Sequence, residues 1–202
     1  MTKVRSKNEA KRQQILIAAT ELFTEQGYAS TSMSIIAKRA SVSKQTVYSH
    51  FGSKEELFSA SISQKCDSMI ILDISKLDVT DPKAMLVEFG RRFLSVITSK
   101  EALAVHKICA FESKAYPQLS ELFYDAGPER ITVQVAKMMA RLNDEGILKI
   151  PNPRYAALHY LHLVKGEAWM RVEFNTKKQL TTREVEDYLD ATVEFFMKGY
   201  TK

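Results

Sequence analysis

The chain has 202 residues, 45% of them hydrophobic and 26% charged, which is typical of an ordinary globular protein with one large or two small domains. No stretch approaches the roughly 20 consecutive apolar residues of a membrane span, and the charged N-terminus lacks the apolar core of a signal peptide, so we expect a cytoplasmic protein. Cys66 and Cys109 lie far apart, so they suggest neither a disulfide framework nor a cysteine-based zinc site.

The excess positive charge is confined to the first third of the chain. Residues 1–65 contain ten Lys and Arg against five Glu, whereas the remaining residues contain 19 basic and 19 acidic side chains. This asymmetry favours a polyanion-binding module joined to a neutral one. A basic segment is also often no more than a solvated surface, so charge alone does not decide the function.

Three helices are predicted before residue 53. The first follows a capping box at residues 6–9 and ends at Gly27, where glycine favours a left-handed stop. The second covers residues 33–40 and the third covers residues 44–51, each after a Ser or Thr that can cap it. Two short helices joined by a tight turn, inside a basic three-helix unit, can place the second of them in the major groove of DNA.

Helical signals continue beyond residue 53. A capping box at residues 53–56 opens a long fourth helix. Prolines in the first helical turn open further helices at Pro82, Pro128 and Pro153, and a capping box at residues 181–184 precedes the last one. Two shorter helices are expected between the first and second of these prolines. The sequence therefore predicts an all-α chain of about nine helices.

The segment TSMSIIAKRASVSKQTVYSHFGSKEELF, residues 31–58, closely resembles the signature of TetR-type regulators, and AATELFTEQGY before it resembles the first helix of that family. The resemblance covers roughly the first third of the chain. It implies a helix-turn-helix DNA-binding domain at residues 7–53, a linking helix at 54–80, and an effector-binding and dimerisation domain at 81–202. It further implies a ligand-responsive repressor that binds a palindromic DNA operator as a homodimer.

By the same resemblance, polar side chains of the second and third helices contact DNA. Gln45 stands where family members often have glycine, and its amide can read adenine through two hydrogen bonds. Lys44 can donate to guanine or phosphate, and Thr46 can contact thymine or the DNA backbone. Serines in such positions also serve simply as helix caps. The residues expected to bind DNA are Ser32, Met33, Ser34, Lys44, Gln45, Thr46, Tyr48, His50 and Lys54, the last three through phosphates.

The resemblance also implies an effector site and a dimer interface within residues 81–202. Soft and aromatic side chains suit a small apolar or amphipathic effector, and those proposed to line its pocket are Phe89, Phe93, His106, Met138, Met139 and Trp169. The residues proposed for a four-helix dimer interface are Leu158, Leu161, Val185, Leu189, Val193 and Phe196. Apolar stripes at helical spacing are more often plain core, so both sets also fit an intrachain interpretation.

Two other functions were weighed against a transcriptional regulator. An all-α enzyme is the first, but the sequence has no nucleophile elbow, P-loop, dinucleotide fingerprint or HExxH motif, so we expect neither catalysis nor a cofactor. His159 and His162 share a helical face, but no Cys, Asp or Glu in a recognisable pattern completes a metal site. A non-specific architectural DNA-binding protein is the second, and base-reading groups such as Gln45 and Thr46 argue against it.

Overall fold

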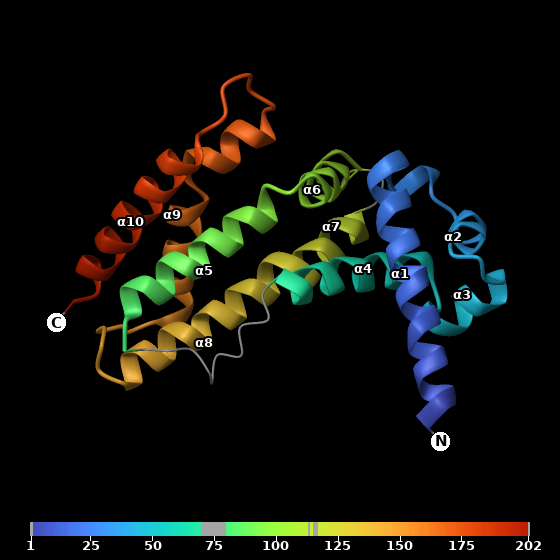
Figure 1. Ribbon diagram of the computed structural model, residues 1–202, viewed down its shortest axis with the longest axis horizontal. Helices are drawn as coiled ribbons and strands as arrows, with labels where there is room; N and C mark the ends of the chain where they lie inside the picture. Colours follow the sequence, from blue (N-terminus) through green and yellow to red (C-terminus); the bar gives the residue numbers. More distant parts are fainter. Residues whose placement is uncertain (1, 70–79, 113, 115–116, 202) are drawn as a thin grey trace. The chain divides into compact units, whose positions relative to one another are not determined.

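The computed structural model describes residues 2–69, 80–112, 114 and 117–201, and every regular element within these ranges is helical (Figure 1). This confirms the prediction of an all-α chain that begins with a helix-turn-helix. Of the predicted linking helix at 54–80, the structure describes α4 (Lys54–Met69) and residue 80. Residues 70–79 lie outside the described residues. The predicted capping box at residues 6–9 lies inside α1 (Thr2–Ser30), whose helical backbone already begins at Thr2.

The first compact unit comprises residues 1–67 and 104–127. It contains α1, α2 (Met33–Arg39), α3 (Lys44–Phe51) and α4, together with most of α6 (Lys100–Glu112) and α7 (Pro117–Tyr124). One hydrophobic core holds these helices together. At its centre the ring of Tyr28 stacks on Phe23, with ring centres 5.7 Å apart, and meets the edge of Phe58 at 5.3 Å.

The membership of α6 and α7 differs from the domain boundaries expected from sequence, which assigned residues 81–202 to one C-terminal domain. The physical reason is shared burial, because Cys109, Leu119 and Ala126 lie in the same hydrophobic cluster as the buried residues of α1 to α4. Such long-range packing leaves no local signal in the sequence.

The second compact unit comprises residues 68–103 and 128–202. In it, α5 (Pro82–Ile97), α9 (Pro153–Glu173) and α10 (Thr182–Gly199) pack against one another, and α8 (Arg130–Asp144) packs on α9 (Figure 1). Gly90 permits close approach of these helices, because a Cβ there would lie 3.1 Å from both Leu189 Cδ2 and the Tyr160 hydroxyl. That hydroxyl donates a 2.5 Å hydrogen bond to the Leu86 carbonyl, and burial raises the pKa of Tyr160 above its ordinary value.

The predicted helix starts are confirmed in three of four cases in this unit. Asp81 and Asn152 cap α5 and α9, each with proline in the first turn, and Thr181 with Glu184 forms a capping box at α10. The expected start at Pro128 is wrong. Pro128 lies inside a π-helical segment, η2 (Asp125–Glu129), between α7 and α8, because proline has no N–H and its ring displaces the carbonyl four residues earlier.

A break within α9 lies at Gly166, whose φ of 43° and ψ of −153° are accessible to glycine and strained for other residues. Tyr188 of α10 fills the space beside it, and its hydroxyl donates a 2.7 Å hydrogen bond to the Leu163 carbonyl. A Cβ at position 166 would lie 2.6 Å from Tyr188 Oη. The break therefore depends on both the backbone freedom and the small size of glycine.

We expect Gly166→Ala to lower the free energy of unfolding by about 1 to 3 kcal/mol through backbone strain alone. Displacement of Tyr188 from the Leu163 carbonyl adds to this cost. Gly199→Ala is the matched control, because nothing lies within 4 Å of a Cβ at that position. Urea denaturation at one fixed protein concentration measures both variants, and equal stabilities would contradict the expectation.

Candidate nucleic-acid interface

The helix-turn-helix is built from two capped helices and one left-handed residue. Ser32 caps α2 by accepting a 3.2 Å hydrogen bond from the Ile35 N–H, and Ser43 caps α3 by accepting one of 3.0 Å from Thr46. Between the helices Ser41 has a φ of 53°, which turns the chain sharply. The predicted turn and both predicted caps are therefore present.

The helix α3 has one buried face and one exposed polar face. Val47 and Phe51 enter the core, and the guanidinium of Arg12 lies 5.2 Å from the centre of the Phe51 ring. The side chains of Lys44, Gln45 and Tyr48 are exposed. An exposed, capped helix with an amide, an ammonium and a phenol on one face has the donors and acceptors that base edges and phosphates require.

The nine residues predicted to bind DNA differ in how far their side chains are exposed. Met33 is buried with 5% of its surface exposed, so it packs in the core and cannot reach DNA in this conformation. Thr46 shares a 2.7 Å hydrogen bond with Ser43 and is only partly exposed, as is His50. Lys54 bonds inward, to backbone carbonyls. The predicted residues with exposed side chains are Ser32, Ser34, Lys44, Gln45 and Tyr48.

Ile35 was missed by the sequence interpretation. It is 42% exposed on α2, one helical turn after the cap Ser32 and next to Ser34. The sequence interpretation gave Ile35 no role, because it sought DNA contacts among polar side chains, whereas Ile36 and Ala37 are buried as expected. Its methyl groups could contact a thymine methyl.

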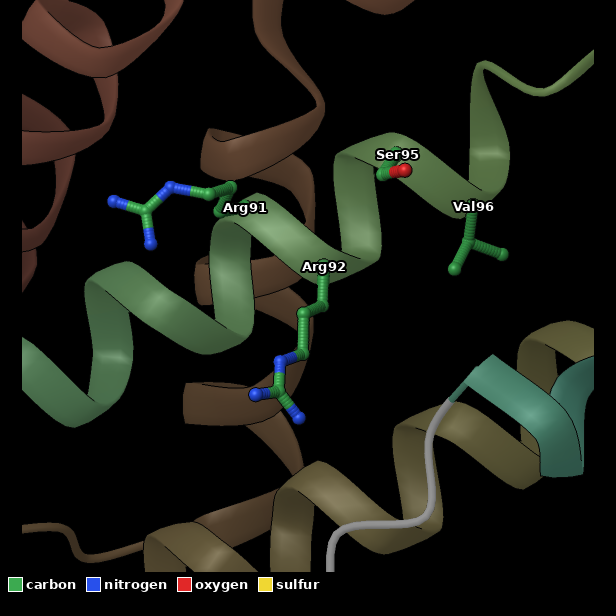
Figure 2. A pocket seen from close by; sticks show the side chains of 4 residues that line it. All are labelled: Arg91, Arg92, Ser95 and Val96. Carbon is green, nitrogen blue, oxygen red and sulfur yellow. The ribbon is translucent and has the colours of Figure 1, made fainter.

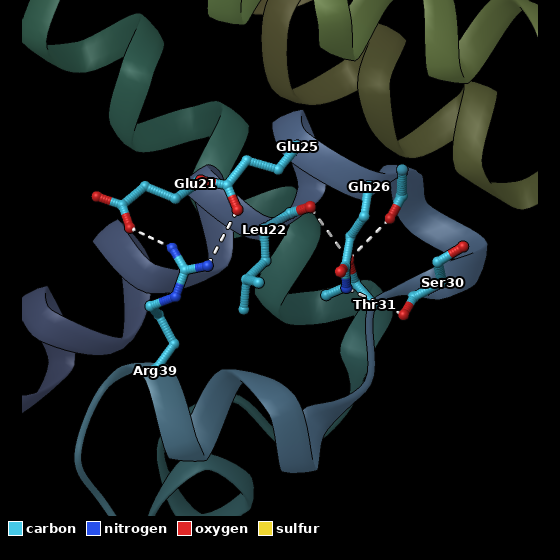
Figure 3. Close-up of polar contacts among 8 residues, drawn as sticks. Glu21, Leu22, Glu25, Gln26, Ser30, Thr31 and Arg39 are labelled. Carbon is cyan, nitrogen blue, oxygen red and sulfur yellow. Dashed lines mark hydrogen bonds and ion pairs between the residues drawn. The ribbon is translucent and has the colours of Figure 1, made fainter.

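A salt bridge between α1 and α2 neutralises one of the basic residues counted from sequence. Arg39 donates to Glu21 and Glu25 of α1, each at 3.0 Å (Figure 3). The hydrogen bond with Glu25, followed by that with Glu21, raises the pKa of Arg39 above its ordinary value. The guanidinium group therefore links α2 to α1. Because two carboxylates neutralise its charge, Arg39 adds little to the attraction for DNA.

The residues predicted for an effector pocket do not converge on one cavity. The rings of Phe89 and Phe93 stack at 6.4 Å, and Phe89 also approaches Tyr160, all within the core of the second unit. Met138 and Met139 are buried there too. His106 belongs to the first unit, so it is not grouped with the others.

Trp169 is only partly exposed, because the Lys165 ammonium lies 3.6 Å from the centre of its ring system. Burial, the larger effect, lowers the pKa of Lys165, whereas the nearby Glu173 carboxylate raises it. Trp169 therefore lies in a charged environment, and a cation–π contact already covers one face of its indole.

A cavity of about 340 Å³ lies beside α5, lined by Arg91, Arg92, Ser95 and Val96 (Figure 2). None of these residues was predicted from sequence. Arg91 donates Nε and Nη2 to Glu186 of α10, each at 2.7 Å, and this pairing raises its pKa above the ordinary value. Arg92 donates Nε to Glu88 at 2.6 Å. Two of the four lining residues are thus ion-paired arginines, and Val96 contributes an apolar side chain.

The residues predicted for the dimer interface are mostly core residues of a single chain. Leu161 of α9 and Leu189, Val193 and Phe196 of α10 are at most 6% exposed, because α5, α9 and α10 pack against one another within the chain. They are therefore unavailable to a second chain in this conformation. Leu158 and Val185 are partly exposed. The exposed large apolar residues of α9 and α10 are instead Tyr155, Met170, Phe174, Tyr188 and Phe195.

Two features are absent from the described residues, a membrane-spanning helix and a cluster of metal-binding side chains. No helix among them combines the length and apolar character needed to cross a membrane. In the same part of the chain, no three His, Cys, Asp or Glu side chains form a group that could hold a metal ion. His159 bonds to the Tyr200 hydroxyl and His162 to the Leu158 carbonyl, both at 2.8 Å, so each imidazole has a structural partner.

A capped helix-turn-helix with an exposed polar second helix defines the class of helix-turn-helix DNA-binding proteins. Two family models match the chain. Residues 15–61 match the bacterial regulatory proteins of the tetR family, and residues 84–202 match the C-terminal domain of AefR-like transcriptional repressors. The chain belongs to the TetR family of transcriptional regulators.

Among curated relatives, the transcriptional activator FasR of Mycolicibacterium smegmatis is 44% identical over 62 residues, which are 31% of this chain and 28% of FasR. The regulator UidR of Escherichia coli is 42% identical over 64 residues, which are 32% of this chain and 33% of UidR. These matches thus span only about a third of each relative. The proteins named in them are regulators and not enzymes.

Solved structures match nearly the whole chain. The flavonoid-responsive regulator FrrA is 33% identical, with a TM-score of 0.77 and coverage of 96% of this chain and 98% of FrrA. A TetR-family regulator from Mesorhizobium loti is 29% identical, with the same TM-score and the same coverage. The helical architecture beyond the helix-turn-helix is therefore also that of the family.

Proposed function

We propose that this chain is a ligand-responsive transcriptional repressor that binds a palindromic operator as a homodimer. The observation that carries the proposal is the exposed polar face of α3, where Lys44, Gln45 and Tyr48 stand clear of the core. Repression is favoured over activation because the match over residues 84–202 is to a repressor family. Bound at a promoter, such a dimer blocks transcription by occupying the site.

The proposed dimer forms through exposed apolar surface on α9 and α10. Tyr188, Ala191 and Phe195 recur at helical spacing on one exposed side of α10, and Tyr155 is exposed on α9. Exposed aromatic residues clustered on two adjacent helices mark an interaction surface more often than a solvated one. A two-fold axis through this surface would bring two copies of α3 to one duplex.

The proposed effector is a small amphipathic compound that binds within residues 81–202. The cavity beside α5 supports this, because Arg91, Arg92 and Ser95 give its lining polar groups and Val96 offers apolar surface. A hydroxylated aromatic compound fits such a lining, and FrrA, whose name describes it as flavonoid-responsive, gives the same chemical class. No cofactor is required for this mode of action.

Selection of bound sites from random duplex DNA tests the proposal. We expect an inverted repeat whose half-sites are centred about one helical turn apart or slightly more, since the two recognition helices of a dimer meet successive major grooves. A consensus without inverted symmetry would exclude the dimeric mode. Binding without any sequence preference would instead favour a non-specific architectural protein.

A further inference from the structure

The ammonium group of Lys54 lies against the carboxyl end of α1. Its Nζ donates hydrogen bonds to the backbone carbonyls of Tyr28, at 2.8 Å, and Thr31, at 3.0 Å. The same atom lies 3.9 Å from the centre of the Tyr28 ring. Two carbonyl oxygens and one aromatic face therefore surround the cation, and a lysine cation is favoured at the negative end of a helix dipole.

The helical backbone is interrupted at this point, where the Tyr28 carbonyl also accepts a 3.2 Å hydrogen bond from the Thr31 N–H. Gly27 has a φ of 82° and a ψ of 171°, and the last carbonyls of a helix have no donor further along it. Thr31, which is 1% exposed, lies directly before Ser32, the cap of α2. The ammonium group of Lys54 thus donates hydrogen bonds to backbone carbonyls of the segment that connects α1 to α2.

Two neighbours of Lys54 on α4 hold the same tyrosine. The Tyr28 hydroxyl donates a 2.8 Å hydrogen bond to Glu55, and the ring of Phe58 meets the Tyr28 ring edge-on. Glu55 also accepts from its own backbone N–H, and this bond, followed by the one from Tyr28, lowers the pKa of its carboxyl group. Residues at the start of α4 therefore contact the carbonyl, the ring and the hydroxyl of Tyr28.

We propose that Lys54 is a positioning residue, which fixes the junction between α1 and α2 to the start of α4, and not a phosphate contact. Because α2 begins two residues after Thr31 and packs on α3, loosening this junction releases the helix-turn-helix from the geometry that DNA binding needs. Only this consequence for DNA binding rests on the proposed function. The effect on folding follows from the contacts alone.

The test compares Lys54→Met with Lys44→Met, the same change at an exposed position on α3. We expect Lys54→Met to lower the melting temperature by about 3 °C or more. Amide exchange should quicken roughly tenfold at Thr31, whose N–H donates to the Tyr28 carbonyl, and at Ile36, whose N–H donates to the Ser32 carbonyl at the start of α2. Lys44→Met should leave the melting temperature and the exchange unchanged.

The salt dependence of DNA binding separates positioning from phosphate contact. Each lost phosphate contact lowers the slope of log affinity against log salt by about 0.9, so Lys44→Met should lower it by about one. Lys54→Met should weaken binding at every salt concentration with the slope unchanged. Lys54→Arg, which keeps the cation and the N–H donors, should recover part of the melting temperature and of the affinity.

The proposal is overturned if Lys54→Met keeps the melting temperature and exchange rates of the parent chain while the slope falls by about one. Should Lys54→Met not fold, Lys54→Gln, which keeps N–H donors without the charge, replaces it. An intermediate melting temperature then supports the proposal, and a parental one with a reduced slope overturns it. If no variant binds DNA, the proposed function fails, whereas melting and exchange still decide the role of Lys54.

Discussion

Phe195→Glu is expected to give a folded monomer whose affinity for a palindromic operator falls by about a hundredfold or more, since one recognition helix alone loses the second half-site. Phe195 is 68% exposed on α10, so the carboxylate costs little in the isolated chain. In a two-fold interface it would be desolvated and would face its own copy nearby. Sedimentation and operator titration at micromolar concentration measure both effects.

Two control variants separate the dimer surface from the core and from exposure in general. Val193→Glu places the same charge at a position with 0% exposure, two residues away, and should prevent folding. Phe111→Glu makes the same change at an aromatic residue that is 84% exposed on α6, and should leave the dimer intact. A dimeric Phe195→Glu protein would exclude the proposed surface on α10.

Gln45→Ala is expected to weaken binding to the selected operator by about 5- to 150-fold, equivalent to about 1 to 3 kcal/mol, and to relax preference at one or two base pairs. The Gln45 side chain is exposed on α3 and alanine favours a helix, so stability should be preserved. Its role as a base reader is therefore separable from folding.

Gln14→Ala on α1 is the matched control for Gln45, because Gln14 is also an exposed helical glutamine but lies outside the helix-turn-helix. It should bind the operator as the parent chain does. Repeating the site selection with Gln45→Ala identifies which base pairs lose preference. An equal loss of affinity for all sequences would show that Gln45 does not read bases.

Local signals in the sequence predicted those parts of the fold that depend on local chemistry. The caps at Ser32, Ser43 and Thr181 each need only a side-chain oxygen and an N–H group three residues later. The predicted left-handed stop at Gly27, whose φ is 82°, is likewise a property of a few adjacent atoms. Together with the signature of residues 31–58, these signals were sufficient for the helix-turn-helix.

The errors concern residues whose environment is set by distant parts of the chain. Periodicity identifies the apolar stripe that contains Val193, but it cannot tell whether α5 of the same chain or a second chain covers that stripe. Met33 follows a predicted cap and was assigned to DNA, although the core of the first unit buries it. Lys54 is basic in sequence, and only the fold brings the carbonyls of Tyr28 and Thr31 to its ammonium group.

The break at Gly166 divides α9 into two helices with separate rotational phases. In an unbroken helix each residue advances about 100° around the axis, so the directions of early side chains determine those of later ones. With a ψ of −153° at Gly166, the directions of the side chains before the break no longer determine those after it. Met170 and Phe174 therefore need not lie in line with Tyr155. Selection could therefore alter the orientation of the exposed residues after the break without disturbing the buried register of the residues before it.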